Sequence, residues 1–237
     1  MAEEPIKLFA TRAERYPESS DADIPQAAVR VALTVLGGPL PELLSLILTP
    51  ALARRRDVWF KEFADAFDEL SAKIEGVKVE NLADNEAFVS ATIQASRIAI
   101  GTHQAEKREM LRNALLNVAV GGGPQEDLQE IFIAAIESLS PTHMKVLRFL
   151  SSSLPDLQMA GISWTTENRN AFPNYSAVIG ELYPELKSEE GLLTYTMLDL
   201  YNRGFSKVPG PLSSFPQQPA VADMGVEFLR FVLEPPK

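Results

Sequence analysis

The sequence predicts a mainly α-helical fold: a multi-helix bundle followed by a small winged-helix-like α+β region. Apolar residues recur at spacings of three and four along most of the chain, which is the period of an amphipathic helix. Capping residues and glycines delimit these segments, and the chain becomes richer in Pro, Ser, Asn and Tyr after Leu154-Pro155. We therefore expect an N-terminal arm over residues 1–23, a helical bundle over 24–153 and the winged-helix-like region over 154–237.

The composition excludes several classes of protein. The 237 residues are 46% hydrophobic, as in ordinary globular proteins, and include no cysteine. Disulfides, iron–sulfur clusters, cysteine nucleophiles and cysteine-based zinc fingers are thereby excluded. The 22 basic and 32 acidic residues give a net charge of −10, which argues against a broad nucleic-acid footprint. The polar start, with Glu3 and Glu4, does not resemble a signal peptide, and we expect a cytoplasmic protein.

An apolar segment at 31–53 is the most unusual part of the chain, because it carries a single charged residue. Its length would suffice to span a membrane. However, the Gly-Gly-Pro sequence at 37–39 and Pro50 divide it into pieces of about ten residues, which are typical of core helices or re-entrant segments. We expect two short apolar helices, at 24–36 and 40–50, that meet at the Gly-Gly-Pro turn.

The residues that follow this segment allow two interpretations. Three arginines and a tryptophan come next, and basic and aromatic residues beside an apolar run are typical membrane-interface anchors. In one interpretation, the hairpin at 27–59 contacts a membrane or a partner; in the other, it is buried at the centre of the bundle. The contact residues in the first interpretation are Leu43, Leu44, Ile47, Arg54, Arg55, Arg56 and Trp59.

The rest of the bundle reads as successive amphipathic helices. The clearest spans 57–75, and its apolar stripe is Trp59, Phe60, Phe63, Phe67, Leu70 and Ile74. Further helices are predicted over 84–100, 102–120, 125–139 and about 142–152. Ser140 would cap the last of these, with Pro141 at its first position.

The C-terminal region has the order of elements of a winged helix-turn-helix. Helices are predicted at 142–152, 175–183 and 189–203, followed by a segment at 204–220 that could form a short β-hairpin, and by a last helix at 223–233. The alternative is one continuous bundle. Four prolines (Pro209, Pro211, Pro216, Pro219) exclude a regular helix over 204–220.

The charges of this region disfavour DNA as its partner. Residues 151–237 contain six basic and ten acidic side chains. Glu189 and Glu190 open the helix that would enter the major groove, where they would repel phosphate. We therefore expect a winged helix that contacts protein or is purely structural.

Two histidines are the candidates for acid–base chemistry. Arg97 and His103 are separated by five residues, a spacing that resembles HEPN-type ribonucleases, in which His would act as acid or base and Arg would hold a phosphate. Gly101 breaks the helix between them, so the alternative is an ordinary helix end. We interpret His143 as a satisfied residue in the first turn of its helix.

Other short patterns do not support a metal or cofactor site. Asp65, Asp68 and Glu69 lack a further ligand at metal-binding spacing, and the Gly-Gly-Gly-Pro sequence at 121–124 lacks the Lys-Ser/Thr of a phosphate loop. We predict no cofactor.

Several stretches resemble the abortive-infection alpha family of bacterial phage-resistance proteins. They are Gly37-Gly38-Pro39-Leu40-Pro41-Glu42-Leu43-Leu44, Arg54-Arg55-Arg56-Asp57-Val58-Trp59, Asn85-Glu86-Ala87-Phe88, the run from Lys107 to Asn117, and the run from Phe132 to Pro141. The resemblance covers roughly residues 35–155. It implies an intracellular bacterial protein that acts in phage defence, and it carries no catalytic residues with it.

Together these patterns predict a non-enzymatic interaction or regulatory protein with a protein partner, and they are compatible with a homo-oligomer. The alternatives are a membrane-active effector that uses 27–59, associating with the membrane on activation, and a ribonuclease that uses Arg97 and His103.

Overall fold

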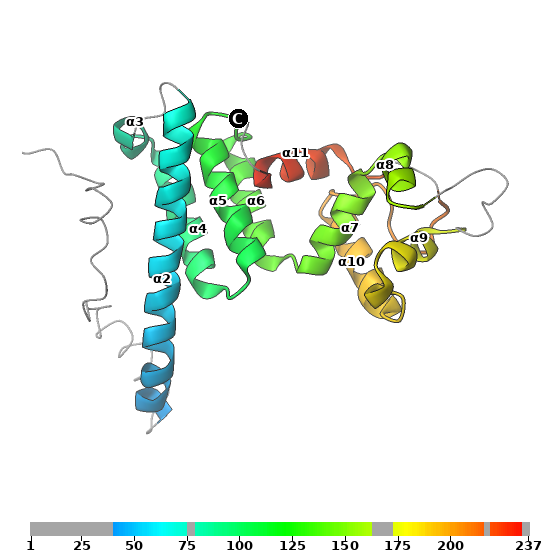
Figure 1. The fold of residues 1–237 in the computed structure, drawn as a ribbon, viewed down its shortest axis with the longest axis horizontal. Coiled ribbons are helices and arrows are strands. Elements are labelled where there is room, and N and C mark those ends of the chain that lie inside the picture. Colours follow the sequence, from blue (N-terminus) through cyan, green and yellow to red (C-terminus); the bar gives the residue numbers. More distant parts are fainter. Residues whose placement is uncertain (1–39, 75–78, 163–172, 216–218, 234–237) are drawn as a thin grey trace, which may run out of the picture. The chain divides into compact units, whose positions relative to one another are not determined.

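The computed structural model describes residues 40–74, 79–162, 173–215 and 219–233, and these are mainly helical (Figure 1). The predicted arm at 1–23 and the predicted helix at 24–36 lie outside the described residues. The described residues divide into two compact units, those up to Ile133 and those of 134–233. The division falls within a helix, α6 (Glu126–Ser138). The reason is that the next helix, α7 (Pro141–Ser151), packs against helices that follow it in the chain.

The first unit is built around one long helix, α2 (Leu40–Lys73), which packs on α4 (Glu86–Gly101) and α5 (Ala105–Ala119). A short helix, α3 (Val79–Ala83), packs on α4. Arg55 lies level with the last residue of α4, so the part of α2 that precedes it extends beyond α4 (Figure 1).

The predicted break at Pro50 is wrong, because Pro50 lies inside α2. A proline removes one helical hydrogen bond, here the one to the carbonyl of Leu46, and its ring crowds that carbonyl. The leucines and alanines on both sides are strong helix formers, and the rest of the helix packs on two neighbours. Helices at 40–50 and 57–75 are therefore parts of one element.

The core of the first unit follows the predicted apolar stripes. Phe63, Phe67 and Leu70 of α2 are buried, whereas Phe60 and Ile74 are half-buried. On α4 and α5 the fully buried residues include Ala95, Ala99, Leu111, Ala114 and Leu115. The small alanine side chains let neighbouring backbones approach, so these helices pack closely.

The second unit contains α7, α8 (Leu154–Met159), α9 (Tyr175–Leu182), a 3₁₀ turn η1 (Pro184–Leu186), α10 (Glu190–Asn202) and α11 (Asp223–Val232). α7 packs against α10 and α11. The core of the second unit is aromatic. Phe205 stacks on Phe228 at 4.9 Å between ring centroids, and Tyr175 meets Phe149 and Phe215 edge to face. The cap predicted for α7 is confirmed, because the Ser140 side chain accepts a hydrogen bond from the backbone of His143.

The described residues of 204–220 form isolated bridges instead of the expected hairpin strands. Ser206 bridges to Val221, and Ser214 bridges to Asn174. The carbonyl of Leu150 on α7 also accepts hydrogen bonds from the amides of Ala220 and Val221, at 2.8 and 3.1 Å. Proline has no amide to donate, so this segment cannot support a continuous ladder and is tied to α7 instead.

Candidate interaction surface

The most prominent surface feature is one face of α10. Leu192, Tyr195, Leu198 and Tyr201 are 41%, 62%, 46% and 44% exposed, and they recur at every third residue. The opposite face is buried and comprises Leu193, Thr196, Met197 and Leu200. We call the four exposed residues the α10 face. Large apolar side chains gathered on one surface mark a contact site more often than scattered ones do.

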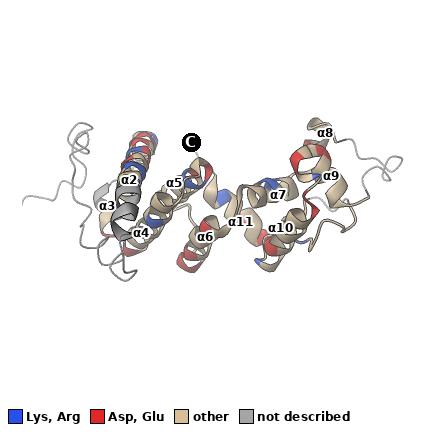
Figure 2. Ribbon diagram, turned by 90° about the horizontal axis from the view of Figure 1, so that it is seen from below, with Lys and Arg blue, Asp and Glu red and all other residues tan. Residues whose placement is uncertain are grey.

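Few charges interrupt this helix. Glu190 and Asp199 are the only charged residues of α10, and its ribbon is accordingly largely tan in Figure 2. Glu189 precedes the helix and Arg203 follows it. Thus an acidic start and a basic end bracket the α10 face.

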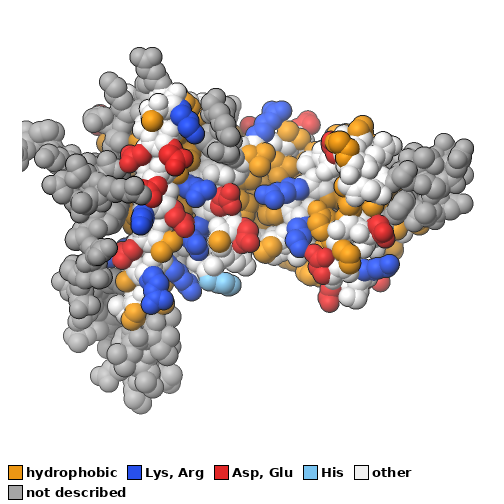
Figure 3. Space-filling model, in the orientation of Figure 1, with side chains coloured by type: hydrophobic (Ala, Val, Ile, Leu, Met, Phe, Trp, Pro, Cys, Tyr) orange, Lys and Arg blue, Asp and Glu red, His pale blue; other side chains and the backbone are white. Residues whose placement is uncertain are grey.

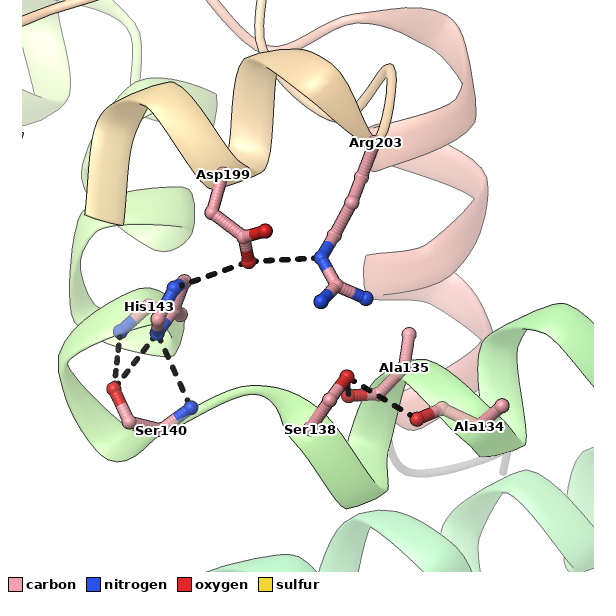
Figure 4. Close-up of polar contacts among 7 residues, drawn as sticks. All are labelled: Ala134, Ala135, Ser138, Ser140, His143, Asp199 and Arg203. Atoms are coloured by element: carbon pink, nitrogen blue, oxygen red, sulfur yellow. Dashed lines mark hydrogen bonds and ion pairs between the residues drawn. The ribbon is translucent and has the colours of Figure 1, made fainter. Parts of the chain in front are cut away.

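A polar cluster fixes α10 to the start of α7 (Figure 4). His143 lies buried in the first turn of α7; its Nδ1 atom is 2.7 Å from the Ser140 hydroxyl, and its Nε2 atom is 3.3 Å from the Asp199 carboxylate. Arg203 donates through Nε to the same carboxylate oxygen at 2.8 Å. The ring of Tyr195 meets that of His143 edge to face at 5.9 Å between centroids. The cluster thus anchors one residue of the α10 face.

This cluster contains a serine, a histidine and an aspartate, but its geometry is that of a helix cap. The hydroxyl of Ser140 accepts from the backbone amide of His143, while the backbone amide of Ser140 donates to Nδ1 at 3.2 Å, which completes a capping box. The imidazole is buried. We therefore assign the cluster a structural role, as expected for His143 from the sequence.

The arginines after the apolar segment have separate roles. Arg55 donates to the carbonyl of Gly101 at 3.2 Å and so satisfies the C-terminal end of α4. Arg56 pairs with Asp57 at 3.1 Å, and Arg54 is exposed. Figure 3 shows acidic as well as basic side chains on the face of α2 that it presents.

Trp59 is a core residue rather than the exposed anchor of the first interpretation. It is 1% exposed, stacks on Phe63, and its indole nitrogen donates to the hydroxyl of Ser96 on α4 at 2.9 Å. The side chains of Leu43, Leu44 and Ile47, on the first turns of α2, lie outside what the structure describes. Among the described helices, none has an apolar run long enough to cross a bilayer.

Arg97 and His103 occupy different settings. Arg97 lies on α4 and lines an open groove of about 460 Å³ toward α6, together with Glu126 and Glu130. His103 is exposed in the loop between α4 and α5. A phosphodiester bound by Arg97 in this groove would face two carboxylates, which disfavours it. The arrangement gives the ribonuclease hypothesis no support.

Neither metal-binding clusters nor known relatives add a further site. In the described part of the chain, no three His, Asp or Glu side chains gather in a way that could hold a metal ion. Comparison of the chain with protein-family models, with curated proteins and with solved structures finds no match. The α10 face is a site that the sequence patterns did not single out.

Proposed function

We propose that this chain is a non-enzymatic interaction protein, and that the α10 face is its contact surface. The observation that carries the proposal is the exposure of four large apolar side chains on one helix that is well anchored on its other side. Leucine and tyrosine offer large contact areas, and the tyrosine hydroxyl can hydrogen-bond to water while the surface is free.

The anchoring supports recognition by a preformed surface. Asp199 holds both His143 and Arg203, so α10 is fixed to α7 before any partner arrives. A surface that is ordered beforehand loses less conformational entropy on binding. The α10 face therefore suits docking without refolding.

We further propose that residues 141–233 form a winged-helix-like module adapted to protein contact. The order α7, α9, α10 and the bridged segment after α10 support it. In such a module α10 would hold the position of the recognition helix. Its apolar face and the preceding Glu189 and Glu190 favour a protein partner over DNA. A role in phage defence, which the sequence resemblance implies, stays a prediction.

Site-specific photo-crosslinking in the native host tests the proposal. A photoreactive amino acid replaces Leu198 on the α10 face or, as a matched control, Met159 on α8, which is 82% exposed. We expect a discrete protein adduct from position 198 and none from position 159. Absence of any adduct at 198, with the tagged chain folded and expressed at the same level, would overturn the proposal.

A further inference from the structure

The first unit carries a groove between α4 and α6 that the proposed function does not use. It is open and has a volume of about 460 Å³, which is enough for several side chains of a partner. Along α6 its lining residues are spaced by three and four, so one face of that helix forms a wall. We call it the α4–α6 groove; the lining residues that matter for its chemistry are Ala87, Ala91, Ile93 and Arg97 of α4, and Glu126 and Glu130 of α6.

The acidic side chains of the α4–α6 groove gather at one end. The connections from α4 to α5 and from α5 to α6 are short, so the chain reverses at each and α4 runs parallel to α6 (Figure 1). The first turns of α4 and α6 therefore lie at the same end, and they carry Glu86 and Glu126. The last turn of α5, which also lies at this end, contains no basic residue. Arg97 lines the groove ten residues further along α4, toward the opposite end.

Glu126 and Glu130 are exposed and lie one helical turn apart on α6. Among the described residues, neither carboxylate has an ion-pair partner. Two like charges at this spacing disfavour each other, and a basic group near both would relieve the repulsion. Charge complementarity therefore indicates a cationic occupant at this end of the groove.

The α4 wall of the groove suits an apolar contact with a polypeptide. Ile93 is 67% exposed, and the small side chains of Ala87 and Ala91 let a partner approach the helix closely. Between Ala87 and Arg97 the groove follows α4 for about 15 Å, the length of nearly three helical turns. A small molecule would keep much of its surface in water in so open a groove, whereas an amphipathic helix can lay one face into it.

Both walls of the groove are held in place before any partner binds. Asn85 caps α4, because its side-chain oxygen accepts a hydrogen bond from the backbone amide of Phe88 at 3.1 Å. The side-chain nitrogen of Gln129 donates to the carbonyl of Pro124 at 2.8 Å and so ties α6 to the turn that precedes it. A groove with ordered walls loses little conformational entropy on binding.

We propose that the α4–α6 groove binds an amphipathic helical segment of a partner protein. Basic side chains one turn apart on that segment contact Glu126 and Glu130, and an apolar side chain covers Ile93. The proposal goes beyond the α10 face and does not depend on it, since the groove belongs to the first unit and α10 to the second.

Peptides selected from a random display library on the purified full chain provide the probe. We expect the selected peptides to carry two basic residues one helical turn apart beside apolar ones. Fluorescence anisotropy then measures their affinity. Glu126→Lys should raise the dissociation constant about tenfold, because it places like charges together. Glu106→Lys is the matched control: Glu106 also lies in the first turn of its helix, α5, but it does not line the groove, so the affinity should stay unchanged.

The apolar contact has its own pair of variants. Ile93→Ser should raise the dissociation constant about fivefold, because it removes buried apolar area from the complex. Ile131→Ser, at a side chain on α6 that is 48% exposed and does not line the groove, should leave the affinity unchanged. A helical circular-dichroism spectrum identical to that of the wild type shows that each variant is folded. A proline at the centre of the selected peptide should abolish binding if the peptide is helical.

Several outcomes would overturn the proposal. One is a library that yields no basic peptides, and another is a set of peptides that bind Glu126→Lys as tightly as the wild type. Acetylarginine amide that binds as tightly as the peptides would make the groove a site for small cations instead. Peptides whose binding is lost in Leu198→Glu but kept in Glu126→Lys would occupy the α10 face, so they would count against the groove while supporting the proposed function.

Discussion

At Gly225 the backbone of α11 comes too close to its neighbours for a side chain. A Cβ atom there would lie 2.3 Å from the carbonyl oxygen of Phe205 and 2.8 Å from the Val221 side chain. The first of these is backbone, which cannot rotate away. The segment after α10 is thereby held tightly against α11.

Gly225→Ala should therefore destabilise the second unit by about 3 kcal/mol, because it overpacks a closed contact. Gly191→Ala is the matched control: Gly191 lies in α10 with open space around it, and alanine there should stabilise by about 0.5–1 kcal/mol through helix propensity. Chemical denaturation measures both changes. Equal effects of the two substitutions would contradict the close approach at Gly225.

The ion pair between Lys145 and Glu185 predicts a pH dependence. Their side chains meet at 2.6 Å between α7 and η1. The hydrogen bond from Lys145 lowers the pKa of Glu185 below 4.5, and the same bond raises the pKa of Lys145 above 10.5. The pair thus stabilises the fold above about pH 4.5 and below about pH 10.5, and its contribution is lost as the pH falls through the lowered pKa of Glu185 or rises through the raised pKa of Lys145.

Glu185→Gln should therefore lower the unfolding free energy slightly at neutral pH, and the difference from wild type should vanish below the folded pKa of Glu185. Both side chains are exposed, so solvent screens the effect. Urea titrations at pH 7 and at acidic pH measure it, with Glu181→Gln on α9 as an exposed carboxylate for comparison. A difference that persists unchanged in acid would exclude the ion pair as its source.

At the scale of the elements, α2 and α4 are joined by a buried aromatic residue with one polar contact. Trp59→Ala should cost about 3–5 kcal/mol, because it empties a core position. Ser96→Ala should cost about 1–2 kcal/mol, because it leaves the indole N–H without that acceptor. The neighbouring Val58→Ala, at a side chain that is 38% exposed, should change stability by less than about 0.5 kcal/mol. A neutral effect of Trp59→Ala on the thermal midpoint would contradict its place in the core.

Most helices could be predicted from the sequence because their apolar stripes and caps agree. Trp59 had two competing interpretations, as part of the buried stripe of 57–75 and as a surface anchor. The stripe was the correct guide, because a helix with polar residues on its other side can bury only that stripe. The sequence alone could not show whether Pro50 ends the helix. The free-energy cost of a proline inside a helix can be offset by the packing of the rest of α2.

The α10 face could not be predicted in the same way. Leu192, Tyr195 and Leu198 alternate along the chain with Leu193 and Met197, so α10 is apolar on all sides and its period does not reveal which side is buried. The buried side is the one that packs against elements distant in the sequence, such as α7, where Asp199 also contacts His143 and Tyr195 meets the imidazole ring. Such long-range contacts leave no local signal.

At the scale of the whole molecule, the apolar surface suited to interaction lies on the second unit. In the first unit, Trp59 is buried, Arg55 caps the end of α4 and Arg56 pairs with Asp57. The second unit instead presents four large apolar side chains on one ordered helix. The central claim is therefore that the α10 face is covered by protein in the cell.

Thiol accessibility measures that claim most directly, because the chain has no cysteine of its own. Tyr195→Cys places a single thiol on the α10 face, and Met159→Cys places one on an exposed position of α8. We predict that maleimide modifies the thiol at 195 several-fold more slowly in permeabilised host cells than in the dilute purified protein, while the thiol at 159 reacts equally fast in both. Equal rates at 195 in cells and in dilute solution would contradict the account.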